Sequence, residues 1–597
     1  MARKKEIEEI NTILKELEQF HLSAGPLYQK VNSCKALLNP ENNELDVIYN
    51  LMESHSPGLR NKTVYRYEKL LADESNPFQK SNQLELSKER LTIKCSTYPK
   101  EKKIQEMLNQ IDEFPKEWTV VQLTPQYNPM EIWNEDPDIY YTNAINISMF
   151  TSKKPFLVTC GAPRDPVNGD GIELCNEIIS ILKVNKEVLT SHSKKMFSNY
   201  KEKNDYMHKV QGVEDRLKLL IKDMQKMWLK EWRCLLTGKY CDEKIESQIR
   251  DDVINSLKSE LPELNITQKI ETILCCVVKN YLHLKLNEVK NIVQFCFPEI
   301  KDKIKIRTIV KVIRGIGQNV FIENEKAKRH PVILILHDSL DCFPWEMLDV
   351  LEDHPACRLP SLHFLYCLFK EHENDIVDGY KLVKDYNKGA YVVNPTMDLK
   401  NMETRMMSFF NYWTPNWIGS SGYQPSKDEF FELLTSCDIF SYNGHGSGSH
   451  YLPMDKFQKS HVKAVVMLFG CGSTKIVRTD PQADMFGHYY MYLIARCPCV
   501  VGMLWEVADK STDVLSTDFM SFWIPSDADK HWKYIDKQQW QRGGETVFSK
   551  NLPIFDDDNT WEPDLLRALI LAKKNLPSIM TKAACVVRGL PVKINKS

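Results

Sequence analysis

Short apolar runs without polar interruption recur along this 597-residue chain and alternate with helical segments. The clearest run is Val332–Leu336, which reads Val-Ile-Leu-Ile-Leu. A run of that length and composition predicts a strand that is buried on both faces of a sheet. Strands of this kind with helices between them favour a mostly parallel sheet covered by helices on both faces, so the predicted fold class is α/β.

The expected strands and helices are spread unevenly along the chain. Residues 1 to about 115 and about 170 to 325 show mainly helical periodicity, whereas strand patterns gather between these segments and after them. The expected strands are 118–123, 144–150, 155–160, 332–336, 391–393, 439–442, 464–469 and 500–505. The clearest expected helices are 214–229, 270–284, 427–434 and 484–495.

Composition excludes several classes of function. Acidic residues number 80 and basic residues 78, so the formal net charge of -2 does not favour bulk electrostatic binding to nucleic acid or to a membrane surface. The first 20 residues mix charged and apolar positions at helical spacing, unlike a signal peptide, and no apolar run approaches the length of a membrane span. We therefore expect a protein of the cytoplasm and nucleus that binds neither membrane nor nucleic acid directly.

The 17 cysteines are scattered, and no two of them form a Cys-x-x-Cys pair. This spacing gives no support to a zinc site or to a thioredoxin-like redox site. In a reducing compartment most of these thiols are expected to be small buried groups, and no metal or other cofactor is predicted.

Two neighbouring strand ends carry reactive side chains between glycines. The strand 439–442 is followed by Asn-Gly-His445-Gly-Ser-Gly, and the run 464–469 by Gly-Cys471-Gly-Ser-Thr. The carboxyl ends of parallel strands meet at one edge of a sheet, and adjacent strands lie about 5 Å apart, so His445 and Cys471 are expected near each other. An imidazole that accepts the thiol proton turns a cysteine into a strong nucleophile.

This pairing predicts a cysteine peptidase site with His445 and Cys471 as its catalytic pair. Flanking glycines allow tight turns and close approach of a substrate backbone. The backbone amides of Gly446 and Cys471 are the expected donors for the oxyanion that forms on the scissile carbonyl. Two other interpretations stay open. One is a buried structural cysteine; the other is a phosphate-binding loop at 444–448, although that loop lacks the P-loop lysine and no helix opens after it.

The same two segments resemble a known protease family. Tyr-Asn-Gly-His-Gly-Ser-Gly at 442–448 and Leu-Phe-Gly-Cys-Gly-Ser at 468–473 look like the catalytic histidine and cysteine motifs of separase. The 26 residues from His445 to Cys471 favour separase over caspases, whose histidine lies about 50 residues before the cysteine. Segments 343–346, 358–361, 495–498 and 501–509 are also similar to separase, and Gly472 stands where many relatives have serine.

The resemblance implies two tandem caspase-like domains, in a short form of the family such as insects have. Residues 1–115 would form a helical N-terminal region. Residues 116–375 would form an inactive domain interrupted by a helical insertion at about 170–325, and 376–597 the active domain. The first domain is expected to be inactive because no His/Cys pair lies at its strand ends.

Separase cleaves the kleisin subunit of cohesin to release sister chromatids at anaphase, and securin inhibits it as a pseudosubstrate. By resemblance, this chain would cut after arginine in a Glu-x-x-Arg context, with Asp513 or, as second choice, Asp509 binding the guanidinium. A securin-type inhibitor and a separate helical scaffold subunit would be its partners. Chromosomes or the spindle would be its location in mitosis.

Two alternatives to this function stay open. One is an arginine-specific cysteine peptidase of the same clan that acts outside mitosis. The other is a non-catalytic scaffold that keeps the fold and binds a partner. The sequence offers no clear third residue to orient His445, so that role is left unassigned.

Overall fold

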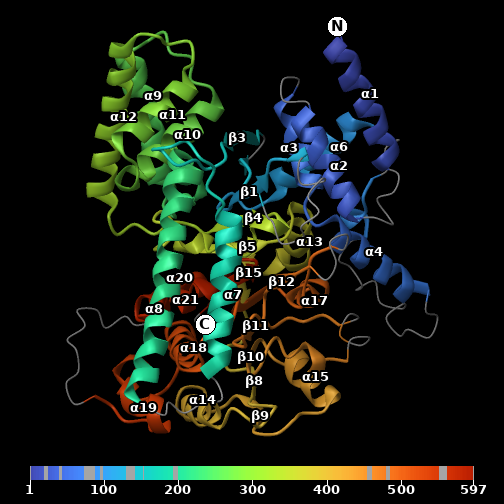
Figure 1. Ribbon diagram of the computed structural model, residues 1–597, viewed down its shortest axis with the longest axis vertical. Helices are drawn as coiled ribbons and strands as arrows, with labels where there is room; N and C mark the ends of the chain where they lie inside the picture. The colour runs from blue at the N-terminus through green and yellow to red at the C-terminus, as the bar shows by residue number, and fades with distance from the viewer. Residues whose placement is uncertain are drawn as a thin grey trace.

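The computed structural model describes residues 2–18, 25–38, 43–72, 88–94, 98–129, 141–151, 154–192, 199–453, 457, 460–478, 484–549 and 561–595. Figure 1 shows a central column of strands with helices on both sides of it. The N-terminal helices and a bundle of helices from the middle of the chain lie beside the upper end of this column. None of the described helices is both long enough and apolar enough to cross a membrane.

An 11-stranded sheet forms the centre of the molecule, in the order β3-β2-β1-β4-β5-β15-β14-β11-β10-β8-β9. β1, β4 and β5 are parallel to one another, as are β9, β8, β10, β11 and β14. β2, β3 and β15 each run antiparallel to a neighbour. The sheet is therefore mostly parallel, which confirms the predicted α/β fold class. The strands are β1 (Thr119–Pro125), β2 (Ile145–Phe150), β3 (Phe156–Cys160), β4 (Val332–Leu336), β5 (Ala356–Leu359), β8 (Gly389–Val393), β9 (Ile418–Ser421), β10 (Ile439–Asn443), β11 (Val465–Leu468), β14 (Cys499–Met503) and β15 (Cys585–Gly589).

Every expected strand is present within a few residues of its expected position. β4 is buried at all its positions, as its unbroken apolar run predicts. The sequence analysis missed β5, β9 and β15, because β5 and β15 each contain an arginine and β9 is rich in glycine and serine. The helix expected at 484–495 is wrong in its first part. There β13 (Phe486–Gly487) pairs with β12 (Ile476–Val477), and only α17 (Tyr489–Ile494) is helical.

The two halves of the sheet meet where β5 pairs with β15, at Arg358 and Arg588. Arg358 donates to both carboxylate oxygens of Glu346, at 2.7 and 2.5 Å. Arg588 donates to both carboxylate oxygens of Asp341, at 2.7 and 2.6 Å, and lies over the ring of Tyr489. Both arginine side chains are almost fully buried, and a buried charge is tolerated only when it is paired in this way. These ion pairs fix the junction that makes the two halves one sheet.

Helices account for most of the chain outside this sheet, as the sequence predicts. The N-terminal region contains α1 (Ala2–Leu17), α2 (Gly25–Leu38), α3 (Glu44–Glu53), α4 (Pro57–Ala72), α5 (Lys88–Leu91) and α6 (Lys100–Glu113). The helical insertion contains α7 (Leu174–His192), α8 (Tyr200–Asp223), η4 (Met224–Leu229), η5 (Lys230–Leu236), α9 (Glu243–Glu260), α10 (Gln268–Lys279), η6 (Tyr281–His283), α11 (Leu286–Cys296) and α12 (Lys303–Asn324).

The remaining helices cover the two faces of the sheet. Figure 1 shows α18, α20 and α21 on one side of the column of strands and α13, α15 and α17 on the other. These helices and their neighbours are α13 (Leu362–His372), α14 (Lys400–Trp413), α15 (Lys427–Ser436), α18 (Asp509–Trp523), α19 (Lys537–Gly543), α20 (Leu565–Lys574) and α21 (Ile579–Ala584). A small sheet of β6 (Ile376–Val377), β7 (Tyr380–Val383) and β16 (Val592–Ile594) completes the fold.

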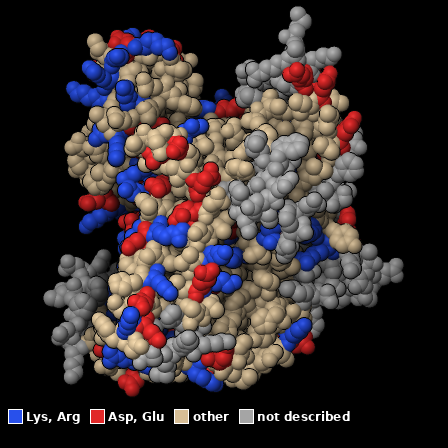
Figure 2. Space-filling model, in the orientation of Figure 1, with Lys and Arg blue, Asp and Glu red and all other residues tan. Residues whose placement is uncertain are grey.

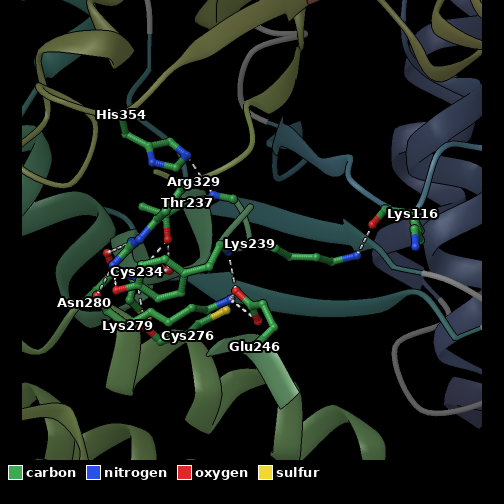
Figure 3. A network of polar contacts seen from close by, with 12 residues as sticks. Lys116, Cys234, Thr237, Lys239, Glu246, Cys276, Lys279, Asn280, Arg329 and His354 are labelled. Atoms are coloured by element: carbon green, nitrogen blue, oxygen red, sulfur yellow. Dashed lines mark hydrogen bonds and ion pairs between the residues drawn. The ribbon is translucent and has the colours of Figure 1, made fainter. Parts of the chain in front are cut away.

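A polar network fixes the helical insertion to the first half of the sheet (Figure 3). Within the insertion, Lys279 of α10 forms an ion pair with Glu246 of α9, with nitrogen and oxygen 3.2 Å apart. His354 accepts the backbone N–H of Gly238 at 2.8 Å. Burial holds the pKa of His354 well below its ordinary value, so the ring is neutral and can accept this bond. The insertion is thus joined to the first half by a buried hydrogen bond at Gly238.

Candidate active site

The loop after β10, which carries His445, folds closely around the ring of Tyr442. Gly446 and Gly448 have φ angles of +61° and +66°, which favour glycine. The Tyr442 hydroxyl donates to the His445 carbonyl at 2.8 Å. A Cβ at Gly444 or Gly448 would lie 2.8 Å from the Tyr442 side chain. The packing of this loop therefore requires the glycines that the sequence analysis singled out.

The imidazole of His445 contacts a carboxylate that the sequence analysis missed. Its Nε2 lies 3.0 Å from Oδ2 of Asp398, in the turn that follows β8. Hydrogen bonds from Thr396 and then from His445 hold the pKa of Asp398 below its ordinary value, so the carboxylate is ionised and accepts both. Asp398 is therefore placed to orient the ring. Because β8 pairs with β10, the strand-edge rule could have directed attention to this turn.

The loop after β11 fixes Cys471 by backbone contacts to the next strand of the sheet. The N–H of Gly472 donates to the Trp505 carbonyl at 3.1 Å, and the Ser473 hydroxyl accepts the N–H of Met503 at 3.0 Å. The φ angle of Gly472 is +59°. Since an L side chain is strained in that conformation, glycine suits this position, where the sequence analysis noted a departure from many separases.

The thiol of Cys471 is half-buried and has a hydrogen-bond acceptor beside it. Its Sγ lies 3.5 Å from the Val507 carbonyl oxygen, to which the thiol donates. Burial raises the pKa of Cys471, and the nearby carboxylates of Asp509 and Glu506 raise it further, while the backbone hydrogen bond at Val507 acts in the opposite direction. Because the thiolate is the nucleophilic form, this thiol depends on a base to remove its proton.

The two glycine-rich loops touch each other through their backbones. β10 and β11 pair in parallel, and a Cβ at Gly470 would overlap the carbonyl oxygen of Gly446. Within the described residues no hydrogen bond joins His445 to Cys471; they contact Asp398 and Val507 respectively. The backbone N–H groups of Gly446 and Cys471 donate to no described protein atom. Two unused donors thus lie in the loops that carry the imidazole and the thiol.

The two aspartates expected to bind a substrate arginine lie on α18 in different environments. Asp513 is buried, and its Oδ2 accepts from Nε and a terminal nitrogen of Arg405 at 2.7 and 2.6 Å. Burial raises the pKa of Asp513 to about 7, although the Arg405 charge acts in the opposite direction. Asp509 is the first residue of the helix and is exposed. Among the described residues, no three His, Cys, Asp or Glu side chains gather as ligands of a metal ion.

Comparison with known sequences identifies one family. The family model described as Separin, protease domain, matches residues 170–512, which include both loops. Separin from Mus musculus is 27% identical over 316 residues, which are 52% of this chain and 14% of the mouse protein. Separin from Schizosaccharomyces pombe is 31% identical over 207 residues, which are 34% of this chain and 11% of the yeast protein.

The fold has a counterpart among solved structures. The crystal structure of the Saccharomyces cerevisiae separase–securin complex matches with a TM-score of 0.66 and 17% sequence identity, over 100% of this chain and 38% of that chain. The matched parts are thus a small share of the curated relatives and well under half of the crystallised chain. Since the family model covers more than half of the sequence, the chain belongs to the separin protease-domain family.

Proposed function

We propose that this chain is a cysteine endopeptidase in which Cys471 is the nucleophile and His445 the base. The observation that carries the proposal is the contact between their two loops, where only glycine at position 470 allows the backbones to approach so closely. The ionised Asp398 carboxylate accepts from Nε2–H of His445, so Nδ1 is the nitrogen left to take the thiol proton. Membership of a protease-domain family supports the same chemistry.

In the reaction that we propose, the Cys471 thiol gives its proton to His445, and the thiolate attacks the scissile carbonyl carbon. The backbone N–H groups of Gly446 and Cys471 stabilise the oxyanion of the tetrahedral intermediate. As the C–N bond breaks, the proton on His445 passes to the leaving amine and an acyl-enzyme remains. Water then hydrolyses the thioester with His445 as general base, which restores the thiol.

The substrate that we propose is a kleisin subunit of cohesin, cut after arginine in a Glu-x-x-Arg context. Support comes from the family and from two aspartates on α18, of which Asp509 lies near the thiol. Asp509 is exposed and can accept a guanidinium directly. Asp513 can do so only if the substrate displaces Arg405 from its carboxylate. Comparing Asp509→Asn with Asp513→Asn on arginine peptides decides which of the two binds the substrate side chain.

Regulation is proposed on the same basis. A securin-type inhibitor is supported by the solved complex of the Saccharomyces cerevisiae separase, which contains securin. We propose that the inhibitor occupies the site as a pseudosubstrate. We also propose a separate helical scaffold subunit that docks on the N-terminal helices. The site of action would be the cytoplasm and nucleus, with chromosomes or the spindle in mitosis.

Cleavage of a kleisin fragment with one Glu-x-x-Arg site tests the proposal. Wild type is compared with Cys471→Ala and with Cys34→Ala, which removes another half-buried free thiol on α2. If wild type and Cys34→Ala cut after the arginine and Cys471→Ala does not, the assignment is supported. Equal cleavage by Cys471→Ala contradicts it. If arbitrary arginine peptides are cut equally well, a related peptidase outside mitosis is favoured. If folded wild type cuts nothing, the scaffold alternative is favoured.

A further inference from the structure

The carbonyl that accepts the Cys471 thiol lies in a loop that the helical insertion contacts. This loop, residues 504–508, joins β14 to α18. α7 starts shortly after β3 in the first half of the sheet, and Figure 1 shows it running down the molecule to the level of the second half. There the Asn185 side-chain amide donates to the Glu506 carbonyl at 2.8 Å. Asn185 is 7% exposed, so this bond is shielded from water.

α8 packs beside α7 and forms a helical hairpin with it. A second set of contacts links α8 to the same loop through α21. The Glu214 carboxylate accepts from the Ser578 hydroxyl at 2.6 Å and from the backbone N–H of Ile579 at 2.7 Å, at the start of α21. The Met580 carbonyl in α21 accepts the indole N–H of Trp505 at 3.1 Å. A carboxylate at a helix N-terminus also interacts favourably with the helix dipole. Glu214 therefore fixes α21, and α21 fixes the first part of the 504–508 loop.

These contacts bear directly on the thiol. Glu506, held by Asn185, immediately precedes Val507, whose carbonyl accepts the Cys471 thiol at 3.5 Å. Trp505 accepts the N–H of Gly472 at 3.1 Å, which ties the same loop to the residue after the nucleophile. Moving the loop therefore changes both the burial of the thiol and its distance from the Glu506 carboxylate, the features that raise the pKa of Cys471.

We infer that the α7–α8 hairpin is a clamp on the 504–508 loop, with Asn185 and Glu214 as positioning residues for Cys471. The inference rests on the proposed function. The clamp gives the helical insertion of the first half a role in the active site. That role is to keep Cys471, in the second half, partly buried and aligned. Neither positioning residue touches the thiol, so each acts through the loop.

The first test measures the rate at which iodoacetamide alkylates Cys471 in the substrate-free protein, followed by mass spectrometry of the Cys471 peptide. Asn185→Ala is expected to raise this rate about fivefold near neutral pH, the fold-change that corresponds to one net hydrogen bond. The reason is that a loosened loop lets water reach the thiol, and hydration lowers a pKa that burial had raised. Asn185→Gln keeps an amide donor and is expected to restore much of the slow rate.

The matched control is Asn324→Ala, which removes a side-chain amide that also donates to a backbone carbonyl, at the end of α12. It is expected to alkylate at the wild-type rate. The buried thiols of Cys437 and Cys497 report on general loosening and are expected to stay protected in every variant. If Asn185→Ala exposes them too, Glu214→Gln replaces it as the test variant. Glutamine keeps the size of the side chain and one acceptor oxygen, so the alkylation rate of Cys471 is expected to rise about twofold.

Peptidase assays of the same variants complete the test. Asn185→Ala is expected to lower kcat about fivefold with little change in KM, because the alignment of the thiol is lost and not the binding of the substrate. Wild-type rates of alkylation and turnover in both Asn185→Ala and Glu214→Gln would overturn the clamp. If no protein cuts any substrate while the alkylation rates still differ as expected, the proposed function fails and the clamp stands.

Discussion

The two halves of the sheet use equivalent strand ends in different ways. Each half has three parallel strands side by side, β1-β4-β5 in the first and β8-β10-β11 in the second. β10 leads to His445 and β11 to Cys471, whereas β4 leads to His337 and β5 to Ser361. The first half thus has a histidine at the matching place and a serine in place of the cysteine. That the first half is inactive stays a prediction.

Contacts with helices occupy the strand ends of the first half. The Ser361 hydroxyl caps α13. The Ser56 hydroxyl, between α3 and α4, donates to the Asp338 carboxylate at 3.2 Å. The ring of His55 packs against the ring of His337, with centroids 5.4 Å apart. The crevice at this edge of the first half is therefore filled by the N-terminal helices.

The corresponding edge of the second half is open. The side chains of His445 and Asp398 are 55% and 59% exposed, so a substrate backbone can reach them. The same fold therefore serves docking in one half and, as we propose, catalysis in the other. The two halves differ in whether helices cover the strand ends. They also differ in the residue that follows the last strand, which is Ser361 after β5 and Cys471 after β11.

The largest effect is expected when the two histidines are compared. His445→Ala should lower kcat about 10²- to 10⁴-fold, since it removes the general base. His337→Ala should leave kcat within about twofold of wild type, since burial lowers the pKa of His337 to about 4 and its Nδ1 contacts Ser339. Turnover of the kleisin fragment measures both. Loss of turnover in His337→Ala, with the fold intact by circular dichroism, would show that the first half takes part in the chemistry.

A large loss of stability is expected where the N-terminal helices dock on the first half. The buried Glu53 carboxylate accepts from Arg60 at 2.9 Å and contacts Nε2 of His363 at 3.0 Å. Burial raises the pKa of Glu53, but the Arg60 charge, His363 and the hydrogen bonds from both together more than reverse this and hold it well below its ordinary value. Glu53→Gln leaves a buried guanidinium unpaired and should lower the free energy of unfolding by about 3 kcal/mol. Denaturant titration measures the change.

Glu373→Gln is the control for that measurement. Glu373 pairs with Lys370 at the surface, and its side chain is 47% exposed, so the change should be within about 0.5 kcal/mol of wild type. Because the pKa of Glu53 is depressed in the folded state, its contribution is present above the ordinary pKa of about 4.5 and fades as the pH falls below it. Equal unfolding energies for wild type and Glu53→Gln near neutral pH would contradict the docking role.

Much of the fold and part of the site follow from local sequence. Unbroken apolar runs located β4 and β11, and glycines around His445 and Cys471 marked the two loops that the pairing of β10 with β11 brings together. These features depend on a few adjacent residues, so one sequence is enough to find them. Their catalytic roles remain predictions.

Other parts depend on tertiary contacts that no local pattern contains. Asp398 lies in the turn after β8, where Asn394 and Met397 adopt φ angles of +49° and +64°. Positive φ is uncommon for residues other than glycine, so the sequence does not reveal the path of this turn. Asp513 meets Arg405 across 108 residues, on helices whose mutual rotation the sequence does not state. β5 and β15 were missed because Arg358 and Arg588, paired in the interior, interrupt their apolar pattern.

A smaller effect on activity is expected for the carboxylate that contacts His445. Asp398→Asn should lower kcat about tenfold, because an amide can present N–H to Nε2 and then favours the tautomer that carries hydrogen on Nδ1. The effect is modest for such a pair because Asp398 is more than half exposed and water screens its charge. The measurement is kcat against pH. Unchanged kcat in Asp398→Asn would show that the ring is oriented by other contacts.

The smallest effect is a pH dependence in the first half. Burial, and then the charge of Asp341, raise the pKa of Asp338 to about 7 from an ordinary 3.8. The folded state therefore favours the protonated carboxyl, and its contribution to stability is lost as the pH rises from about 4 to about 7. Asparagine stays neutral, so Asp338→Asn should match wild type near pH 4 and be more stable near pH 8. The gain should be about 1 kcal/mol, well below the full value of the shift, because Asp338 is partly exposed and water screens its charge. A difference in unfolding free energy that does not vary with pH would mean that Asp338 is ionised throughout, and that the N-terminal helices dock on the first half against a buried charge.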